Sequence, residues 1–264
     1  MASKDTQIIN FEEIFMKVCK IPYCKVNREE FLIKQLKGKV TSEQLEDALE
    51  NGTVNAKIPI ELLNSIADGA IKLERTRAAA ISTVAGMPGK LAMIATIPAD
   101  LLQFYAHVVR VAQKLAYIYG YKEIDLDDST QNVLIIFLGA MSGVNAATAA
   151  LAKFATENAT KIGARVAAKP LSKYALFKIV KTVLATAGIK VTKAGAGQAV
   201  SKAVPIIGGV VSGGLTLAIF TPMAKKLKKE LAALAAMSPE GLEKANIKAD
   251  PILTEFEIVN DIED

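Results

Sequence analysis

Five polar side chains between residues 97 and 121 have types and a spacing that could do chemistry. They are Asp100, Gln103, His107, Arg110 and Lys114. Steps of 3, 4, 3 and 4 residues place them in one stripe along a helix whose other sides are apolar. On one interpretation the stripe faces inward, Asp100 pairs with Arg110, and His107 acts as a pH sensor. On the simpler interpretation, which we favour, the stripe is the solvent-exposed side of an amphipathic helix.

Known catalytic templates fit the chain poorly. Gly86-Met-Pro-Gly-Lys90 resembles half of a phosphate-binding loop, but the first glycine is missing and Leu91 stands where a Ser or Thr would bind Mg²⁺. A nucleophilic pair would require Cys19 or Cys24 to fold onto His107, and nothing local indicates this. These three residues are also too few for a structural zinc site. We therefore predict no catalytic residue, metal or cofactor, and we lean towards a protein that is not an enzyme.

The most unusual feature of the chain is a long segment that is both apolar and basic. Between Glu157 and Glu230 there is no acidic side chain. The 72 residues from 158 to 229 carry twelve lysines and one arginine: Lys161, Arg165, Lys169, Lys173, Lys178, Lys181, Lys190, Lys193, Lys202, Lys225, Lys226, Lys228 and Lys229. The whole chain carries only +5, so the rest of it totals −8 (5 minus 13).

An anionic bilayer suits such a segment, because headgroups neutralise the lysines while apolar side chains enter the acyl boundary. DNA-binding patches are usually more polar and richer in arginine, and aromatics make up only 6% of this chain, so a nucleic-acid partner is disfavoured. The start of the chain lacks the apolar core of a signal peptide. We therefore expect a cytoplasmic protein, peripheral on the inner face of the cell membrane, with anionic lipid as its partner.

The elements that would position these residues are helices throughout. Apolar and polar residues alternate with helical periodicity, and no segment has a sustained period of two. We expect an all-α, multi-helix bundle with a central Gly-rich apolar helical hairpin. The expected helices are residues 6–20, 26–37, one opening at a Thr41-Ser-Glu-Gln44 capping box, 59–76, 98–119, 131–154, 156–168, 171–187, 203–235 and a short one after Ser238.

Two windows without charge, Val133–Ala152 and Ala203–Ala224, have about the length of a membrane span. Both contain closely spaced glycines, which let helix backbones touch. They are equally consistent with a helical hairpin buried in a soluble bundle and with a hairpin that enters the bilayer. A pore-forming or toxin-like bundle that hides this hairpin is a further alternative.

Two motifs in this chain resemble the EcsC family of bacterial proteins. They are the segment from Ile97-Pro-Ala-Asp100 to Ile118-Tyr-Gly-Tyr121, and Val204-Pro-Ile-Ile-Gly-Gly-Val-Val-Ser-Gly-Gly214 followed by the basic run Lys225–Lys229. The resemblance covers about residues 65–230. It implies an all-α, membrane-associated bacterial protein, and it brings no catalytic residues.

We accordingly divide the chain into N-terminal amphipathic helices (1–60), an EcsC-like apolar and basic core (61–235), and a short helix with an acidic tail (236–264). Six acidic residues and no lysine lie between Asp250 and Asp264. An alternative function follows from this: a regulatory or protein-interaction module whose basic groove binds an acidic partner or its own tail. A frayed, solvated terminus explains the tail equally well.

Overall fold

The computed structural model describes residues 18–79, 99–124, 131–157, 182 and 213–258. Every regular element of the described residues is a helix, which confirms the expected all-α bundle. The elements are η1 (Pro22–Cys24), α2 (Arg28–Leu36), α3 (Ser42–Asn51), α4 (Ile60–Ala79), α5 (Ala99–Ile118), α6 (Gln131–Ser142), α7 (Asn145–Glu157), α11 (Gly213–Ala235) and α12 (Pro239–Ile258).

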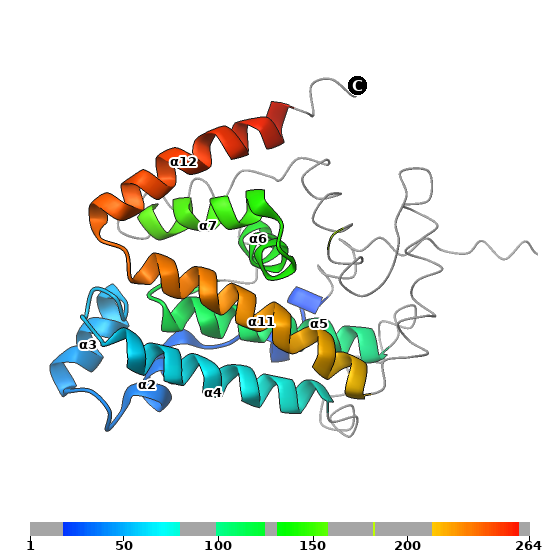
Figure 1. Cartoon of the computed structure of the whole chain (residues 1–264). Helices are drawn as coiled ribbons and strands as arrows, with labels where there is room; N and C mark the ends of the chain where they lie inside the picture. The colour runs from blue at the N-terminus through cyan, green and yellow to red at the C-terminus, as the bar shows by residue number, and fades with distance from the viewer. Residues whose placement is uncertain (1–17, 80–98, 125–130, 158–181, 183–212, 259–264) are drawn as a thin grey trace, which may run out of the picture.

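The helices stack in layers around α6 (Figure 1). Helices α4, α5 and α11 pack against one another, α6 packs on α5, α7 and α11, and α12 covers α7. Helices α2 and α3 pack together near one end of α4, and α2 and η1 contact α5. The core is centred on α6. Its residues from Val133 to Met141, apart from Gly139, are apolar, and each is at most 8% exposed.

Several helix boundaries follow from capping chemistry visible in the sequence. The Thr41 hydroxyl accepts a hydrogen bond from the Gln44 backbone N–H, and the Gln44 side chain accepts one from Thr41 N–H, so the predicted capping box opens α3. Asn27 caps α2 through the Glu30 N–H at 2.9 Å. The Ser238 hydroxyl accepts from Gly241 N–H at 3.2 Å at the start of α12.

The single helix expected over residues 131–154 is wrong, because the chain breaks at Gly143. This residue has a φ of +86°, which ends α6, and α7 begins two residues later. At 12 and 13 residues, the two helices are each about 20 Å long or less, shorter than the hydrocarbon core of a bilayer. None of the helices in the described ranges combines the length and the apolarity needed to cross a membrane.

The last helix is also longer than expected. Helix α12 has 20 residues and includes residues 250–258 of the acidic tail, whereas residues 259–264 lie outside the described residues. Most of the helices expected over 6–20, 156–168 and 171–187, and most of the Gly-rich segment before Gly213, lie outside the described residues.

Candidate functional site

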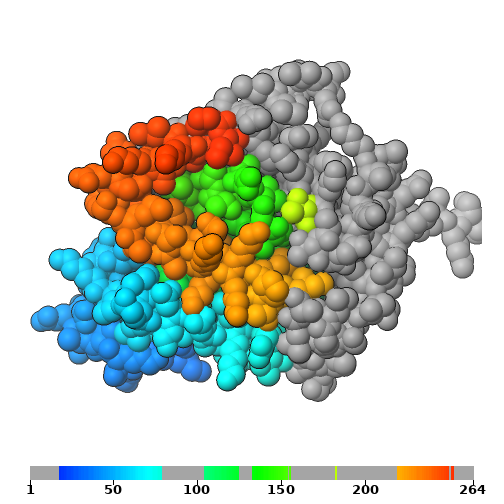
Figure 2. Space-filling view, viewed as in Figure 1, coloured from blue at the N-terminus to red at the C-terminus, as the bar shows by residue number. Residues whose placement is uncertain are grey.

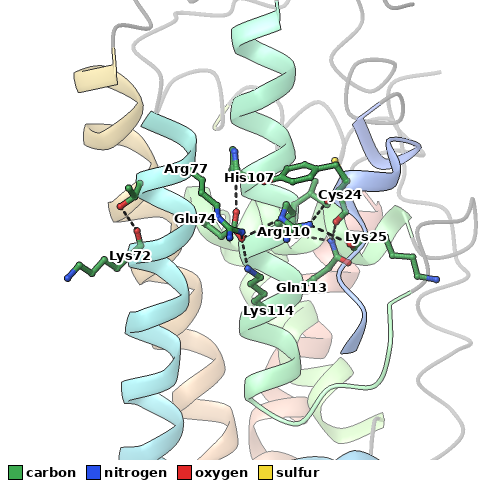
Figure 3. A network of polar contacts seen from close by, with 12 residues as sticks. Cys24, Lys25, Lys72, Glu74, Arg77, His107, Arg110, Gln113 and Lys114 are labelled. Atoms are coloured by element: carbon green, nitrogen blue, oxygen red, sulfur yellow. Dashed lines mark hydrogen bonds and ion pairs between the residues drawn. The ribbon is translucent and has the colours of Figure 1, made fainter. Parts of the chain in front are cut away.

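The described part of the polar stripe of α5, from His107 to Lys114, faces inward, against our preferred interpretation. His107 is fully buried, Lys114 is 5% exposed, and Arg110 is partly buried. All three side chains meet Glu74 on α4, which is itself fully buried (Figure 3). Asp100 and Gln103 belong to α5, but their side chains lie outside the described residues.

The two oxygens of Glu74 have different partners. The Nδ1 atom of His107 lies 2.6 Å from Oε2. Oε1 accepts from Lys114 Nζ and from Arg110 Nε at 3.4 Å, and Arg77 Nη1 lies 3.6 Å away. We call Glu74, Arg77, His107, Arg110 and Lys114 the Glu74 cluster.

Arg110 does not pair with Asp100, as the inward-facing interpretation had supposed. Ten residues along one helix separate the two by about 15 Å, so a direct pair within α5 is geometrically excluded. Instead Arg110 donates to Glu74 and to the carbonyl oxygens of Tyr23 and Lys25. Its guanidinium carbon also lies 4.4 Å from the centre of the Tyr23 ring, a cation–π contact.

The electrostatics of the Glu74 cluster favour an ionised carboxylate. Burial alone would raise the pKa of Glu74, but the hydrogen bond with His107 and the charges of Lys114 and Arg110 outweigh burial and hold that pKa at about 2. Burial also lowers the pKa of Lys114, an effect that the attraction of Glu74 offsets only in part. The cluster therefore holds a buried carboxylate permanently charged at neutral pH.

The N-terminal segment is anchored to the same face of α5. The buried Gln113 amide donates to Cys24 O at 2.8 Å and accepts from Val26 N–H at 3.1 Å. This brings Cys24 close to α5, which the local sequence did not indicate. Burial raises the pKa of the Cys19 and Cys24 thiols to about 12, so neither is a thiolate nucleophile at neutral pH.

The Tyr-Gly-Tyr end of α5 has a structural role. The Tyr119 hydroxyl donates to Asn64 Oδ1 at 2.7 Å, and the Tyr121 hydroxyl donates to Leu151 O at 3.3 Å. The Tyr117 hydroxyl accepts from Ile124 N–H at 3.1 Å. These bonds tie α5 to α4, to α7 and to the chain that follows it, so this motif stabilises the fold.

The basic segment is only partly described. Lys161, Arg165, Lys169, Lys173, Lys178, Lys181, Lys190, Lys193 and Lys202 lie outside the described residues. Lys225, Lys226, Lys228 and Lys229 belong to α11, and three of them are exposed: Lys225, Lys226 and Lys229, which we call the lysine stripe. Lys228 is 18% exposed and instead pairs with Asp68 of α4, with 2.7 Å between Nζ and Oδ1.

The lysine stripe occupies one side of α11. At about 100° per residue its members span an arc of about 100°. The opposite side carries buried apolar residues: Phe220, Met223, Ala224, Leu227 and Leu231. Figure 2 shows α11 on the near face of the molecule, beside α4. Lys225, Lys226 and Lys229 therefore lie together on the exposed side of α11.

Glu74 and Arg77 were not among the predicted site residues. A clue was present, because Glu74 falls in the helical register of the apolar positions of α4: Leu63, Ile66, Ala67, Ala70, Ile71 and Ala78. A charged residue in such a stripe must find a partner inside the protein.

Comparisons with protein-family models, with curated proteins and with solved structures find no match for this chain.

Proposed function

We propose that this protein docks peripherally on anionic membranes through its basic, apolar region, with the lysine stripe of α11 as one part of the docking surface. The observation that carries the proposal is the placement of Lys225, Lys226 and Lys229 on one exposed side of a helix whose other side is held in the core. Each lysine near anionic headgroups contributes on the order of 1 kcal/mol.

The proposal includes the resemblance to the membrane-associated EcsC family and a location on the inner face of the bacterial cell membrane. It assigns no reaction to the protein. Helix α11 is anchored by buried side chains such as Leu227 and Leu231, which are fully buried, so docking needs no exposure of the core. Surface attraction of this kind weakens as salt screens the charges.

Co-sedimentation of the full chain with vesicles tests the proposal. We expect pelleting with phosphatidylglycerol-containing vesicles and none with purely phosphatidylcholine vesicles, and a decline as salt increases. The triple variant Lys225→Gln, Lys226→Gln, Lys229→Gln loses roughly 3 kcal/mol of attraction, which is about a hundredfold in partitioning.

A matched control removes the same charge elsewhere. Lys34, Lys37 and Lys39 are exposed residues in α2 or directly after it. Replacing all three with Gln gives a control variant with the same net charge as the lysine-stripe variant. We expect it to partition within about threefold of the wild type, because each remote surface lysine adds little. Equal losses in the two variants, or equal pelleting with neutral and anionic vesicles, would contradict docking through α11.

A further inference from the structure

Helices α4 and α11 each carry a buried polar side-chain atom that has no hydrogen-bond partner. The two atoms are Nε of Arg75 and the hydroxyl oxygen of Thr221. Both residues are otherwise partly exposed, so they lie at the surface of the bundle and not in its core. A buried polar atom without a partner costs free energy, and two of them on helices that pack together call for an explanation.

Arg75 and Thr221 occupy the same level of the boundary between the two helices, which we call the α4–α11 seam. The start of α4 and the end of α11 lie at the same end of the molecule, so the helices are antiparallel (Figure 1). The ion pair of Asp68 with Lys228 sets their register, with 2.7 Å between Oδ1 and Nζ. Arg75 lies seven residues after Asp68, and Thr221 lies seven residues before Lys228. Each step is about two turns in the same direction along the seam, so both side chains reach one level.

Two lysines flank this level, one on each helix. Lys72 precedes Arg75 by three residues and Lys225 follows Thr221 by four, spacings that keep each pair on one helix face. Both lysines are exposed, and Lys72 points away from the Glu74 cluster (Figure 3). Within the described part of the chain, no carboxylate pairs with Lys72, Arg75 or Lys225. The surface of the seam therefore carries three positive charges that are not neutralised by an ion pair.

We infer that the α4–α11 seam binds the headgroup phosphate of an anionic phospholipid through Arg75 and Thr221, with Lys72 and Lys225 on either side. Binding of this kind rests on the proposed membrane docking, and it extends the docking surface from α11 to α4. A guanidinium presents its N–H donors in a planar fork that matches the oxygens of a phosphate, and a hydroxyl adds one further donor. Because both residues are partly exposed, rotation of the side chains brings these donors to the surface, and no cavity has to open.

Arg75→Lys separates hydrogen bonding from charge. The variant keeps the positive charge but loses Nε and the planar fork, so partitioning of the full chain onto phosphatidylglycerol vesicles should fall about fivefold to tenfold. Arg77→Lys makes the same exchange on the side of α4 that faces Glu74, and its partitioning should stay within about twofold of the wild type. Wild-type partitioning of Arg75→Lys would mean that the seam acts through charge alone, and would overturn the inference.

Thr221→Val removes the hydroxyl at nearly constant shape. We expect vesicle partitioning to fall about threefold to fivefold, while urea unfolding shows equal or higher stability because the deleted atom has no partner. Thr53→Val is the matched control, because the Thr53 hydroxyl donates to Ile118 O at 2.7 Å. This control should lower stability and leave partitioning of the folded protein within about twofold of the wild type. A Thr221→Val variant that loses stability but not partitioning would count against the seam.

The chain contains no tryptophan, so one introduced indole reports which face of the protein meets the lipid. Thr76→Trp places the indole at an exposed position beside Arg75, and Ile247→Trp places it on the exposed side of α12, which packs on α7. In phosphatidylglycerol vesicles that also contain a lipid with a nitroxide headgroup, the fluorescence of Thr76→Trp should be quenched and that of Ile247→Trp should not. Equal quenching of the two variants, or quenching of Ile247→Trp alone, would overturn the orientation that the seam requires.

Sedimentation of the wild type distinguishes failure of the seam from failure of membrane docking. If the wild type does not pellet with phosphatidylglycerol vesicles, the proposed docking fails and the seam fails with it. If the wild type pellets and the lysine-stripe variant loses binding, while Arg75→Lys and Thr221→Val bind normally, docking stands and the seam alone is overturned. Losses in all three variants, with the two controls unchanged, support a phosphate site at the seam.

Discussion

Two buried charges, Arg28 and Glu74, are stabilised in different ways. Arg28 is 8% exposed and donates to the carbonyl oxygens of Ala48, Leu49 and Tyr121 at 2.6 to 3.0 Å. Arg28 thereby caps the C-terminal end of α3 and links it to the end of α5. Carbonyl oxygens at the C-terminal end of a helix favour a positive charge. Glu74 relies on charged donors, so its contribution to stability depends on its ionisation.

The stability of the protein should therefore fall in acid. The folded-state pKa of Glu74 is about 2 and its usual value is 4.5, so the stabilisation is complete above about pH 4.5 and is lost as the pH falls towards 2. The difference corresponds to roughly 3 kcal/mol. We expect urea unfolding curves of the wild type to show this loss in addition to the losses from other carboxylates.

Glu74→Gln isolates that contribution. The variant leaves Lys114 and Arg110 without their carboxylate, and should lose about 3 to 5 kcal/mol of unfolding free energy at pH 7. Its deficit relative to the wild type should shrink between pH 4.5 and 2. Glu61→Gln, at an exposed position in the first turn of the same helix, should change stability by less than about 0.5 kcal/mol. A deficit that is independent of pH would show that Glu74 acts through its shape and not its charge.

The sequence placed His107, Arg110 and Lys114 in one stripe correctly, because helical spacing determines which side chains share a face. It could not determine which way that face points. Orientation depends on whether a neighbouring helix offers a partner, and the partner is Glu74, 33 residues before His107. The apolar register of α4 around Glu74 was the available evidence.

The helix ends determine how the elements fit together. Gly52 ends α3 with a φ of +96°, and a Cβ added there would lie 2.6 Å from the backbone oxygen of Gly120. Gly120 follows α5 with a φ of +94°. The ends of α3 and α5 thus touch through backbone, which only glycine permits at Gly52.

The same substitution at two glycines should have opposite effects. Gly52→Ala places a methyl group against a backbone oxygen in a strained conformation, so we expect a loss of about 2 kcal/mol or more in urea unfolding. Gly69→Ala, in the middle of α4, meets nothing within 4 Å and should gain up to about 1 kcal/mol from helix propensity. Stabilisation by both, or no change at Gly52, would show that the two helix ends are not in backbone contact.

The helix boundaries were predictable where a local capping signal existed, as at Thr41 and Ser238. The break at Gly143 was missed because the apolar pattern continues through it. An added Cβ at Gly143 would overlap the ammonium group of Lys226 on α11. The two residues are 83 positions apart, so no local sequence pattern could have indicated this contact. Tertiary contact therefore decides that boundary as much as propensity does.

For the molecule as a whole, the charge asymmetry of the sequence raises the question of whether the acidic tail covers basic residues. Helix α12 packs on α7, and its described outer side is exposed, with Ile247 at 62% and Ile252 at 41%. The acidic residues up to 258 continue this helix, so their backbone follows α12 away from the turn at residues 236–238 that joins it to α11. Masking of basic residues by the acidic tail therefore stays a hypothesis, and it concerns the basic residues that follow α7 in the sequence.

Removal of residues 250–264 tests that hypothesis. The deletion removes six acidic residues and raises the net charge from +5 to +11 (5 plus 6), so binding to anionic vesicles should strengthen and become more sensitive to salt. A full-length variant with the six acids replaced by amides has the same charge and keeps α12 intact. If charge alone matters, both variants bind vesicles equally. If the tail physically covers the docking surface, the deletion binds more tightly than the amide variant, and unchanged binding in both would eliminate a masking role.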